Sequence, residues 1–200
     1  MHSAQSVSQI AWGGLLLAGG KSLRMRADKS QLSSEKFDAA NLAEHASQQL
    51  QSVSNNNFFL AKDNSYCPAE FCFVADGPEC TGPLVAVQRF CADCKFDYLM
   101  LLPVDMPRIR ATHLLALQKY AEQCGAVSLM CQNDAHKNGF PAVIHHSAYE
   151  PLMAIDHNKL FTALNEIGAQ QVPHDIVASE HQLNLNTPQQ WQRYCELSND

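Results

Sequence analysis

Short apolar runs alternate along the chain with segments in which apolar residues recur every three or four positions. The runs have the length of β-strands, and several are apolar throughout, as is typical of strands buried on both faces of a parallel sheet. They predict strands at residues 12–17, 58–61, 71–74, 98–103, 127–131 and 142–144. All are far shorter than the roughly 20 apolar residues of a membrane-spanning helix, so no membrane partner is expected.

Helices are predicted at residues 42–53, 83–92 and 111–123 and from Pro188 onward. The first and third carry apolar residues at helical spacing, the second has Pro83 in its first turn, and the last follows Thr187 as a capping residue. Strands that alternate with helices predict an α/β fold, in which a mostly parallel, twisted sheet is covered by helices on both faces. Ligands bind such sheets at the carboxyl ends of the strands.

The length of 200 residues fits one α/β domain, which we expect to span residues 10–200. Residues 1–9 contain no Lys or Arg ahead of the first apolar run, so they do not resemble a secretory signal. We interpret them as a flexible N-terminal extension. Without an export signal, the eight cysteines indicate reduced thiols and a cytoplasmic location.

The charge of the chain is unevenly distributed. Its net charge of −6 argues against a nucleic-acid partner. Four of its 14 basic residues nevertheless fall within nine positions, at Lys21, Arg24, Arg26 and Lys29, where Asp28 is the one acidic residue. A local excess of positive charge in an acidic chain indicates a binding site for a small anion.

A predicted strand runs directly into Gly19 and Gly20 just before this basic cluster. Glycines allow main-chain N–H groups to approach a phosphate closely. Arg24 can bind phosphate oxygens through two hydrogen bonds, and Lys29 supplies a mobile point charge. The pattern is neither G-x-G-x-x-G nor G-x-x-x-x-G-K-[ST], which excludes the dinucleotide-binding dehydrogenases and the P-loop NTPases.

Asp105 follows the apolar run at residues 98–103 and precedes Pro107. This position predicts that Asp105 lies at the carboxyl end of a central strand, where one or two carboxylates and substrate phosphates can hold Mg²⁺. The alternative is that Asp105 caps a helix that begins near Met106.

The stretch L-A-G-G-K-S-L-R-M-R-A-D-K at residues 17–29 resembles the signature of the molybdenum cofactor guanylyltransferases. These belong to the wider nucleotidyltransferases that activate sugar phosphates. Three later segments are also similar to family motifs: V-A-D with G-P-L at residues 74–84, P-V-D-M-P at 103–107 and N-T-P at 186–188. The resemblance extends from about Gly14 to Trp191, and it implies a three-layer αβα, Rossmann-like nucleotidyltransferase fold.

The resemblance also implies an activity and the residues that perform it. The enzyme would transfer GMP from GTP to molybdopterin with release of pyrophosphate, using Mg²⁺ held by Asp105. Its partners would be GTP, molybdopterin, the proteins that insert the molybdenum cofactor, and molybdoenzymes. Arg24, Lys29 and Asp105 would be catalytic, and Asn186 would lie on the pterin side. The nucleotide-binding residues would be Leu17, Ala18, Gly19, Gly20, Arg24, Lys29, Ala61, Asp76, Gly82 and Asp105.

The chain departs from the family pattern at several positions. Arg26 and Ala61 stand where the family usually has Gly and Asn, and Phe140 falls within a segment where many members have a His-Pro pair. Residues 33–38 replace a G-K-P-L segment. These departures support the alternative of a non-catalytic nucleotide-binding adaptor that delivers the cofactor. A molybdopterin cytidylyltransferase and a sugar-phosphate nucleotidyltransferase are further alternatives, although A-G-G at residues 18–20 favours guanine.

Overall fold

The computed structural model of the chain describes residues 10–19, 28–77, 82–131 and 139–196. The predicted extension at residues 1–9 lies outside the described residues, as do Gly20, Arg24 and Arg26. The structure therefore does not test the predictions made for these residues.

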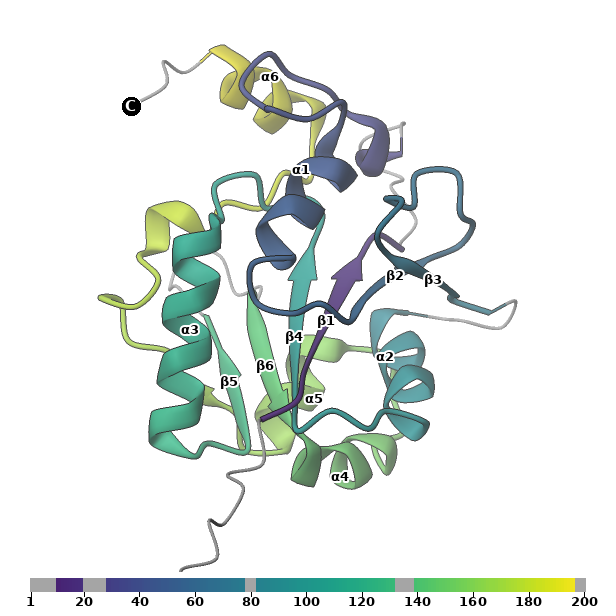
Figure 1. Cartoon of the computed structure of the whole chain (residues 1–200), viewed down its shortest axis with the longest axis vertical. Helices are drawn as coiled ribbons and strands as arrows, with labels where there is room; N and C mark the ends of the chain where they lie inside the picture. The colour runs from purple at the N-terminus through teal and green to yellow at the C-terminus, as the bar shows by residue number, and fades with distance from the viewer. Residues whose placement is uncertain (1–9, 20–27, 78–81, 132–138, 197–200) are drawn as a thin grey trace, which may run out of the picture.

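A seven-stranded sheet in the order β3-β2-β1-β4-β6-β5-β7 forms the centre of the molecule (Figure 1). Neighbouring strands are parallel except that β6 runs antiparallel to both β4 and β5. The strands are β1 (Trp12–Leu17), β2 (Asn57–Ala61), β3 (Cys72–Ala75), β4 (Tyr98–Pro103), β5 (Ser128–Met130), β6 (Ala142–His145) and β7 (Gln170–Gln171).

Helices pack on both faces of this sheet, as predicted. They are α1 (Leu42–Leu50), α2 (Pro83–Ala92), α3 (Ala111–Cys124), α4 (Tyr149–Met153), α5 (Leu160–Glu166) and α6 (Pro188–Glu196). Three single turns of 3-10 helix add η1 (Lys29–Gln31), η2 (His146–Ala148) and η3 (Ser179–His181). Within the described segments, no helix combines the length and the apolar character needed to cross a membrane.

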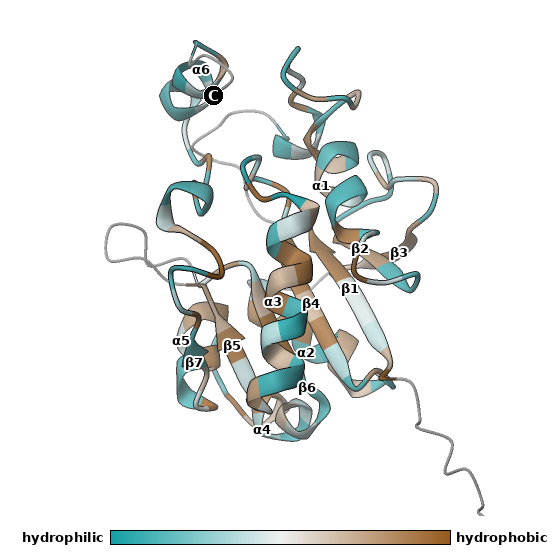
Figure 2. Ribbon diagram, turned by 60° about the vertical axis from the view of Figure 1, so that its left-hand side comes forward, coloured by the Kyte–Doolittle hydropathy of each residue, from teal (hydrophilic) through white to brown (hydrophobic). Residues whose placement is uncertain are grey.

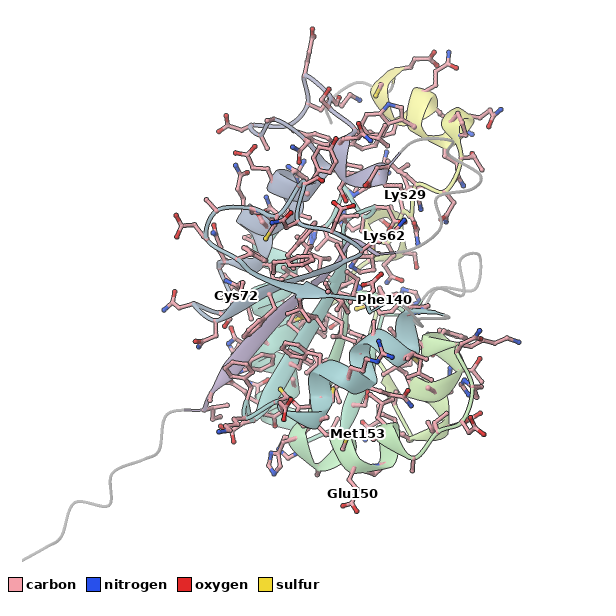
Figure 3. All side chains as sticks on the ribbon, turned by 90° about the vertical axis from the view of Figure 1, so that its right-hand side faces the viewer. Lys29, Lys62, Cys72, Phe140, Glu150 and Met153 are labelled. Atoms are coloured by element: carbon pink, nitrogen blue, oxygen red, sulfur yellow. The ribbon has the colours of Figure 1, made fainter. Side chains whose placement is uncertain are left out.

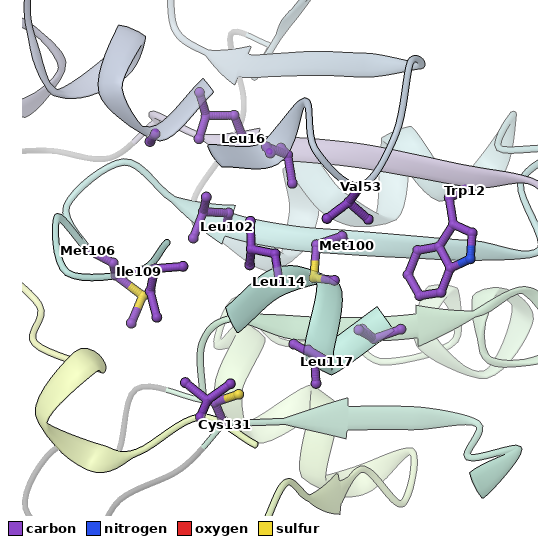
Figure 4. Close-up of a cluster of buried hydrophobic side chains, with 14 of the residues drawn as sticks. Trp12, Leu16, Val53, Met100, Leu102, Met106, Ile109, Leu114, Leu117 and Cys131 are labelled. Atoms are coloured by element: carbon purple, nitrogen blue, oxygen red, sulfur yellow. The ribbon is translucent and has the colours of Figure 1, made fainter. Parts of the chain in front are cut away.

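The three layers arise from the two-residue repeat of the strands. Alternate residues of a strand point to opposite faces, so a strand that is apolar throughout feeds two cores. Leu16 and Leu102 pack with α1 and α3, whereas Leu15 and Leu101 pack with α2, α4 and α5. Figure 4 shows the first of these cores, and Figure 2 shows apolar central strands beneath helices with hydrophilic outer surfaces.

Most of the predicted elements are confirmed. β1, β4 and α2 have the bounds predicted from the sequence, and each of the other predicted strands differs by one residue at one or both ends. The start of α6 is also confirmed, because the Thr187 hydroxyl accepts a hydrogen bond from the Gln190 amide at 3.2 Å. The Gln190 side chain in turn accepts from the amides of Asn186 and Thr187.

Some elements of the fold were not predicted from the sequence. β7, α4 and α5 are two, five and seven residues long, too short for a periodic pattern to identify them. β3 lies at the edge of the sheet, so most of its side chains are exposed although they are apolar. No helix begins at Met106, because residues 104–110 form turns and α3 begins only at Ala111. The alternative that Asp105 caps such a helix is therefore wrong.

Candidate functional site

The carboxyl ends of the four parallel strands β1 to β4 lie side by side. They form the edge of the sheet that runs across the strand ends, which is meant by the sheet edge from here on. In the register, Leu17 of β1 pairs with Leu60 of β2 on one side and with Pro103 of β4 on the other. β3 continues the alignment, since Ala75 pairs with Ala61. The segments that leave these strands, including 18–19, 62–66, 76–77 and 104–105, therefore emerge side by side, and four of the predicted site residues, Ala18, Gly19, Asp76 and Asp105, belong to them.

Lys29 joins three segments that are far apart in the sequence. Its ammonium donates to Asp105 Oδ2 at 2.5 Å and to Asn186 Oδ1 at 2.8 Å. These partners are separated from Lys29 by 76 and 157 residues. Figure 3 shows Lys29 beneath the C-terminal helix, at the end of the sheet where β4 terminates. The first, third and fourth of the family-like segments thus meet at one point.

Asp105 is held in place from both sides. Its backbone carbonyl accepts from the Leu185 amide at 2.9 Å, so the chain leading to Asn186 is fixed against the end of β4. The Asp105 side chain is only 11% exposed. Burial raises the pKa of its carboxyl group above the ordinary aspartate value, and the Lys29 ammonium acts in the opposite direction.

Asp76 lies against the glycine at the end of β1. A Cβ atom on Gly19 would come within 3 Å of both carboxylate oxygens of Asp76, so glycine is needed for this close approach. Gly77, the next residue, has a φ of +89° and lies directly beneath the Arg89 guanidinium, which donates to the Asp76 carbonyl at 2.9 Å. Burial raises the pKa of the Asp76 carboxyl group.

The amides of the glycine segment are used within the sheet. Ala18 and Gly19 both donate to the Leu60 carbonyl, at 2.9 and 3.0 Å. A phosphate that used these two donors would have to share them with Leu60 or displace it. The predicted roles of Gly20 and Arg24 concern residues outside the described part of the chain.

Two buried carboxylate oxygens are available to a metal ion. Within the described residues, neither Asp105 Oδ1 nor Asp76 Oδ1 has a hydrogen-bond partner, and burying such an atom without a partner is costly. Mg²⁺ prefers oxygen ligands and is often held by one or two carboxylates together with substrate phosphates. No cluster of three or more His, Cys, Asp or Glu side chains suited to a metal occurs in the described segments. β2 and β1 lie between β3, which Asp76 follows, and β4, which precedes Asp105, so each carboxylate by itself fits a metal site of this kind in which a substrate supplies further ligands.

A pocket of about 90 Å³ opens beside Gly19. Its lining comes from the ends of β1 and β2 and from the two turns that face them. The lining residues are Ala18, Gly19, Asp28, Ser30, Phe59, Ala61, Lys62, Asp63 and Tyr66. Ala61 was a predicted nucleotide-binding residue, whereas Ser30, Lys62, Asp63 and Tyr66 were not among the predicted site residues. In the sequence, only their position just after the second strand or beside Lys29 could have indicated that they belong to the site.

The segment that replaces the family's G-K-P-L packs against α6. Phe37 is buried and lies against the rings of Trp191 and Tyr194 on α6, with ring centroids 6.1 and 6.0 Å away. The Lys36 ammonium lies 5.1 Å from the centre of the Tyr194 ring and donates to the Tyr194 carbonyl at 2.6 Å. This departure therefore ties α6, and with it the chain that carries Asn186, to the turn that follows Lys29.

The other predicted residues lie at the margins of this edge. Gly82 precedes α2, where a Cβ atom would meet the Asn158 carbonyl at 2.7 Å, so it too is a position of close backbone approach. Phe140, a departure from the family pattern, is half-buried and packs against both apolar cores. Its ring thus serves packing in this structure.

Replacing Asp76 by Asn should raise the free energy of unfolding at pH 7. A raised pKa means that the native state binds more protons than the unfolded chain, so stability falls as the pH rises from the ordinary aspartate pKa through the raised value. Asn removes that cost because it carries no charge. Urea unfolding at pH 7 and pH 4 tests this, and the gain should be smaller at pH 4. Asp175→Asn, at an exposed position, is the control; lower stability of Asp76→Asn at pH 7 would contradict the expectation.

The chain is similar to known proteins over most of its length. The family model described as "MobA-like NTP transferase domain" matches residues 14–183. A molybdenum cofactor guanylyltransferase from Campylobacter jejuni subsp. jejuni serotype O:6 is 23% identical over 185 residues, which cover 90% of this chain and 93% of that protein. A guanylyltransferase of the same name from Campylobacter jejuni strain RM1221 shows the same identity and coverage.

Solved structures share the fold. Molybdopterin-guanine dinucleotide biosynthesis protein A from Archaeoglobus fulgidus superimposes with a TM-score of 0.72 at 19% identity, covering 92% of this chain and 97% of that one. A nucleotidyl transferase from Methanothermobacter also gives a TM-score of 0.72, at 13% identity, covering 93% and 96%. The chain thus has the Rossmann-like αβα fold of nucleotidyltransferases, and the predicted fold class is confirmed.

Proposed function

The chain belongs to the MobA-like NTP transferase domain family, and on that premise we propose that it transfers GMP from GTP to molybdopterin. The contact of Lys29 with Asp105 and Asn186 carries the proposal, because it unites three family-like segments at the ligand-binding edge of the sheet. The curated relatives are molybdenum cofactor guanylyltransferases by name. The proposal includes GTP and molybdopterin as substrates, Mg²⁺ as cofactor, a cytoplasmic location, and cofactor-insertion proteins and molybdoenzymes as partners.

The reaction needs little covalent help from the protein. An oxygen of the terminal phosphate of molybdopterin attacks the α-phosphorus of GTP and forms a new P–O bond. The bond between the α-phosphorus and the bridging oxygen breaks, and its electron pair leaves with pyrophosphate. Because the attacking phosphate is already an anion, no strong general base is required. Catalysis rests on positioning and charge neutralisation, as in phosphoryl transfer generally.

The residues of this edge have distinct parts in that chemistry. Lys29 and Arg24 neutralise the charge of the departing pyrophosphate, and Gly19 and Gly20 allow it to approach the backbone. Asp105, with help from Asp76, holds Mg²⁺, which when bound supplies further positive charge to the phosphate oxygens. Asn186 orients Lys29 and faces the side on which the pterin binds. Leu17, Ala18, Ala61 and Gly82 complete the contacts with the nucleotide.

Ligand-dependent thermal unfolding tests the proposal. The full chain is heated with Mg²⁺ and, separately, GTP, CTP, ATP and UTP. A nucleotide present at 100 times its dissociation constant stabilises the native state by about 2.7 kcal/mol, which for a chain of this size raises Tm by about 5–11 °C. We expect that shift for GTP and a smaller one for the others. A selective shift with CTP would instead indicate the cytidylyltransferase.

Turnover distinguishes an enzyme from a nucleotide-binding adaptor. With GTP, Mg²⁺ and molybdopterin, we expect pyrophosphate to be released in proportion to the guanine dinucleotide formed. A shift of Tm with GTP but no release of pyrophosphate would indicate the adaptor, and no shift with any nucleotide would contradict both functions.

A further inference from the structure

The pocket beside Gly19 has the chemistry of a slot for a flat heterocycle. Ala18, Gly19 and Ala61 leave space because they have short side chains or none, and the half-buried ring of Tyr66 supplies an apolar wall, whereas Phe59 is buried in the core. Asp28 and Ser30 line the same pocket and flank Lys29 in the sequence, so the pocket borders the turn that carries the lysine proposed to bind phosphate. A nucleotide that places its phosphates at Gly19 and Lys29 has this pocket within reach of its base.

Two side chains of opposite charge stand at the mouth of the pocket. Lys62 and Asp63 directly follow β2, and both line the cavity. Asp63 is held in one orientation, since its Oδ1 accepts a hydrogen bond from the Ser65 amide at 3.0 Å. Hydrogen bonds from Ser65 also lower the pKa of the Asp63 carboxyl group, so this carboxylate is charged at neutral pH. A carboxylate has about four lone-pair positions, and Asp63 can therefore accept from a ligand as well.

We infer that Asp63 and Lys62 select guanine, with the Asp63 carboxylate accepting from the base's N1–H and 2-amino groups and the Lys62 ammonium donating to O6. This inference rests on the proposed function, because it takes GTP as the nucleotide. Guanine presents its donors side by side, next to the O6 acceptor, which matches an adjacent carboxylate and ammonium. Asp63 and Lys62 thus supply the polar contacts that Ala61, the residue before them, cannot make.

The other bases fit this pair less well. Adenine carries a donor amino group where guanine has O6, so that group would face the Lys62 ammonium without a hydrogen bond. Uracil lacks a pair of adjacent donors, and cytosine offers the carboxylate a single amino group. A base that leaves polar groups of the site without hydrogen-bond partners binds much more weakly than the base that pairs with them.

Nucleotide analogues test the contact atom by atom. ITP lacks only the 2-amino group of GTP, so the wild-type chain should bind GTP about 10- to 150-fold more tightly than ITP, the range expected from one hydrogen bond to a charged group. In Asp63→Ala this ratio should fall to about one. Lys62→Met should weaken GTP and ITP equally, because both retain O6. The dissociation constants are measured by titration calorimetry with Mg²⁺ present.

The most specific prediction is that the Asp63→Asn substitution reverses the preference of the chain between GTP and XTP. XTP has a carbonyl oxygen in place of the 2-amino group of GTP. In the Asp63→Asn variant, the side-chain amide at position 63 can donate a hydrogen bond to this oxygen. This variant should therefore favour XTP over GTP, whereas wild type favours GTP over XTP. Asn also preserves the side-chain oxygen that accepts from Ser65, so the turn is retained. Glu70→Gln, an exposed carboxylate on the same connection between β2 and β3 that does not line the pocket, is the matched control and should change neither ratio.

The outcomes separate the two proposals. If wild type prefers GTP over CTP, ATP and UTP but the analogue ratios are the same in all variants, base selection by Asp63 is wrong and the proposed function stands. If wild type shows no preference for GTP, both are overturned. Loss of the GTP-to-ITP ratio in Asp63→Ala, together with the reversal in Asp63→Asn, supports both.

Discussion

Asp105→Asn should reduce the rate of nucleotidyl transfer by a factor on the order of 10³ or more, while the chain still folds. In the proposed mechanism this carboxylate holds Mg²⁺ beside the reacting phosphates, and Asn removes its charge without changing its shape. Loss of one preorganised electrostatic contact in an active site costs about 10²–10³ in rate, and loss of the metal adds to that. Pyrophosphate release from GTP and molybdopterin is the measurement.

The effect of the same substitution on stability should be small. Burial raises the pKa of Asp105, so the charged carboxylate carries a desolvation cost that Asn does not. The substitution also leaves Lys29 without its ionic partner, but Lys29 keeps its contact with Asn186. These two effects oppose each other, and we expect the free energy of unfolding to change by less than about 2 kcal/mol.

Asp175→Asn is the matched control for this experiment, because it removes an exposed carboxylate that is not among the proposed site residues. It should leave both turnover and stability unchanged. Wild-type turnover in Asp105→Asn would remove Asp105 from the mechanism. A loss of turnover accompanied by unfolding would show that the residue's main role is structural.

Lys29→Ala should weaken the binding of GTP by about 10- to 150-fold, the range expected from losing one charge-assisted hydrogen bond. The Lys29 ammonium lies where the glycine segment, Asp105 and Asn186 converge, so it is the described cation best placed to meet a triphosphate. The dissociation constant is measured by calorimetry. Turnover should fall as well, since Lys29 is proposed to neutralise the departing pyrophosphate.

Lys119→Ala provides the comparison for Lys29→Ala. Lys119 is an exposed lysine on α3, so its removal changes the net charge of the chain by the same amount without touching the site. GTP affinity should remain at the wild-type value in this variant. Equal affinities of wild type and Lys29→Ala would mean that the triphosphate binds elsewhere.

The pattern of residues close in the sequence was enough to predict β1, β4, α2 and the start of α6. β1 and β4 are continuously apolar because each feeds two cores, and such runs can be recognised without knowing their neighbours. α2 begins at a proline, and α6 begins at a side-chain cap whose partners lie three residues apart. These signals depend on residues that are close in the sequence, which is why their positions were predicted well.

The sequence alone also supplied the candidate residues for the proposed chemistry, through the glycines, the basic cluster and the aspartates that follow apolar runs. It could not indicate that β6 reverses direction, that Lys29 contacts Asp105 and Asn186, or that Asp63 lines a pocket beside Gly19. Strand order and register decide these contacts, because they bring residues 76 and 157 positions apart to one edge of the sheet. Local sequence patterns determined the type of the longer segments, because those patterns depend on neighbouring residues, and tertiary packing decided which segments meet.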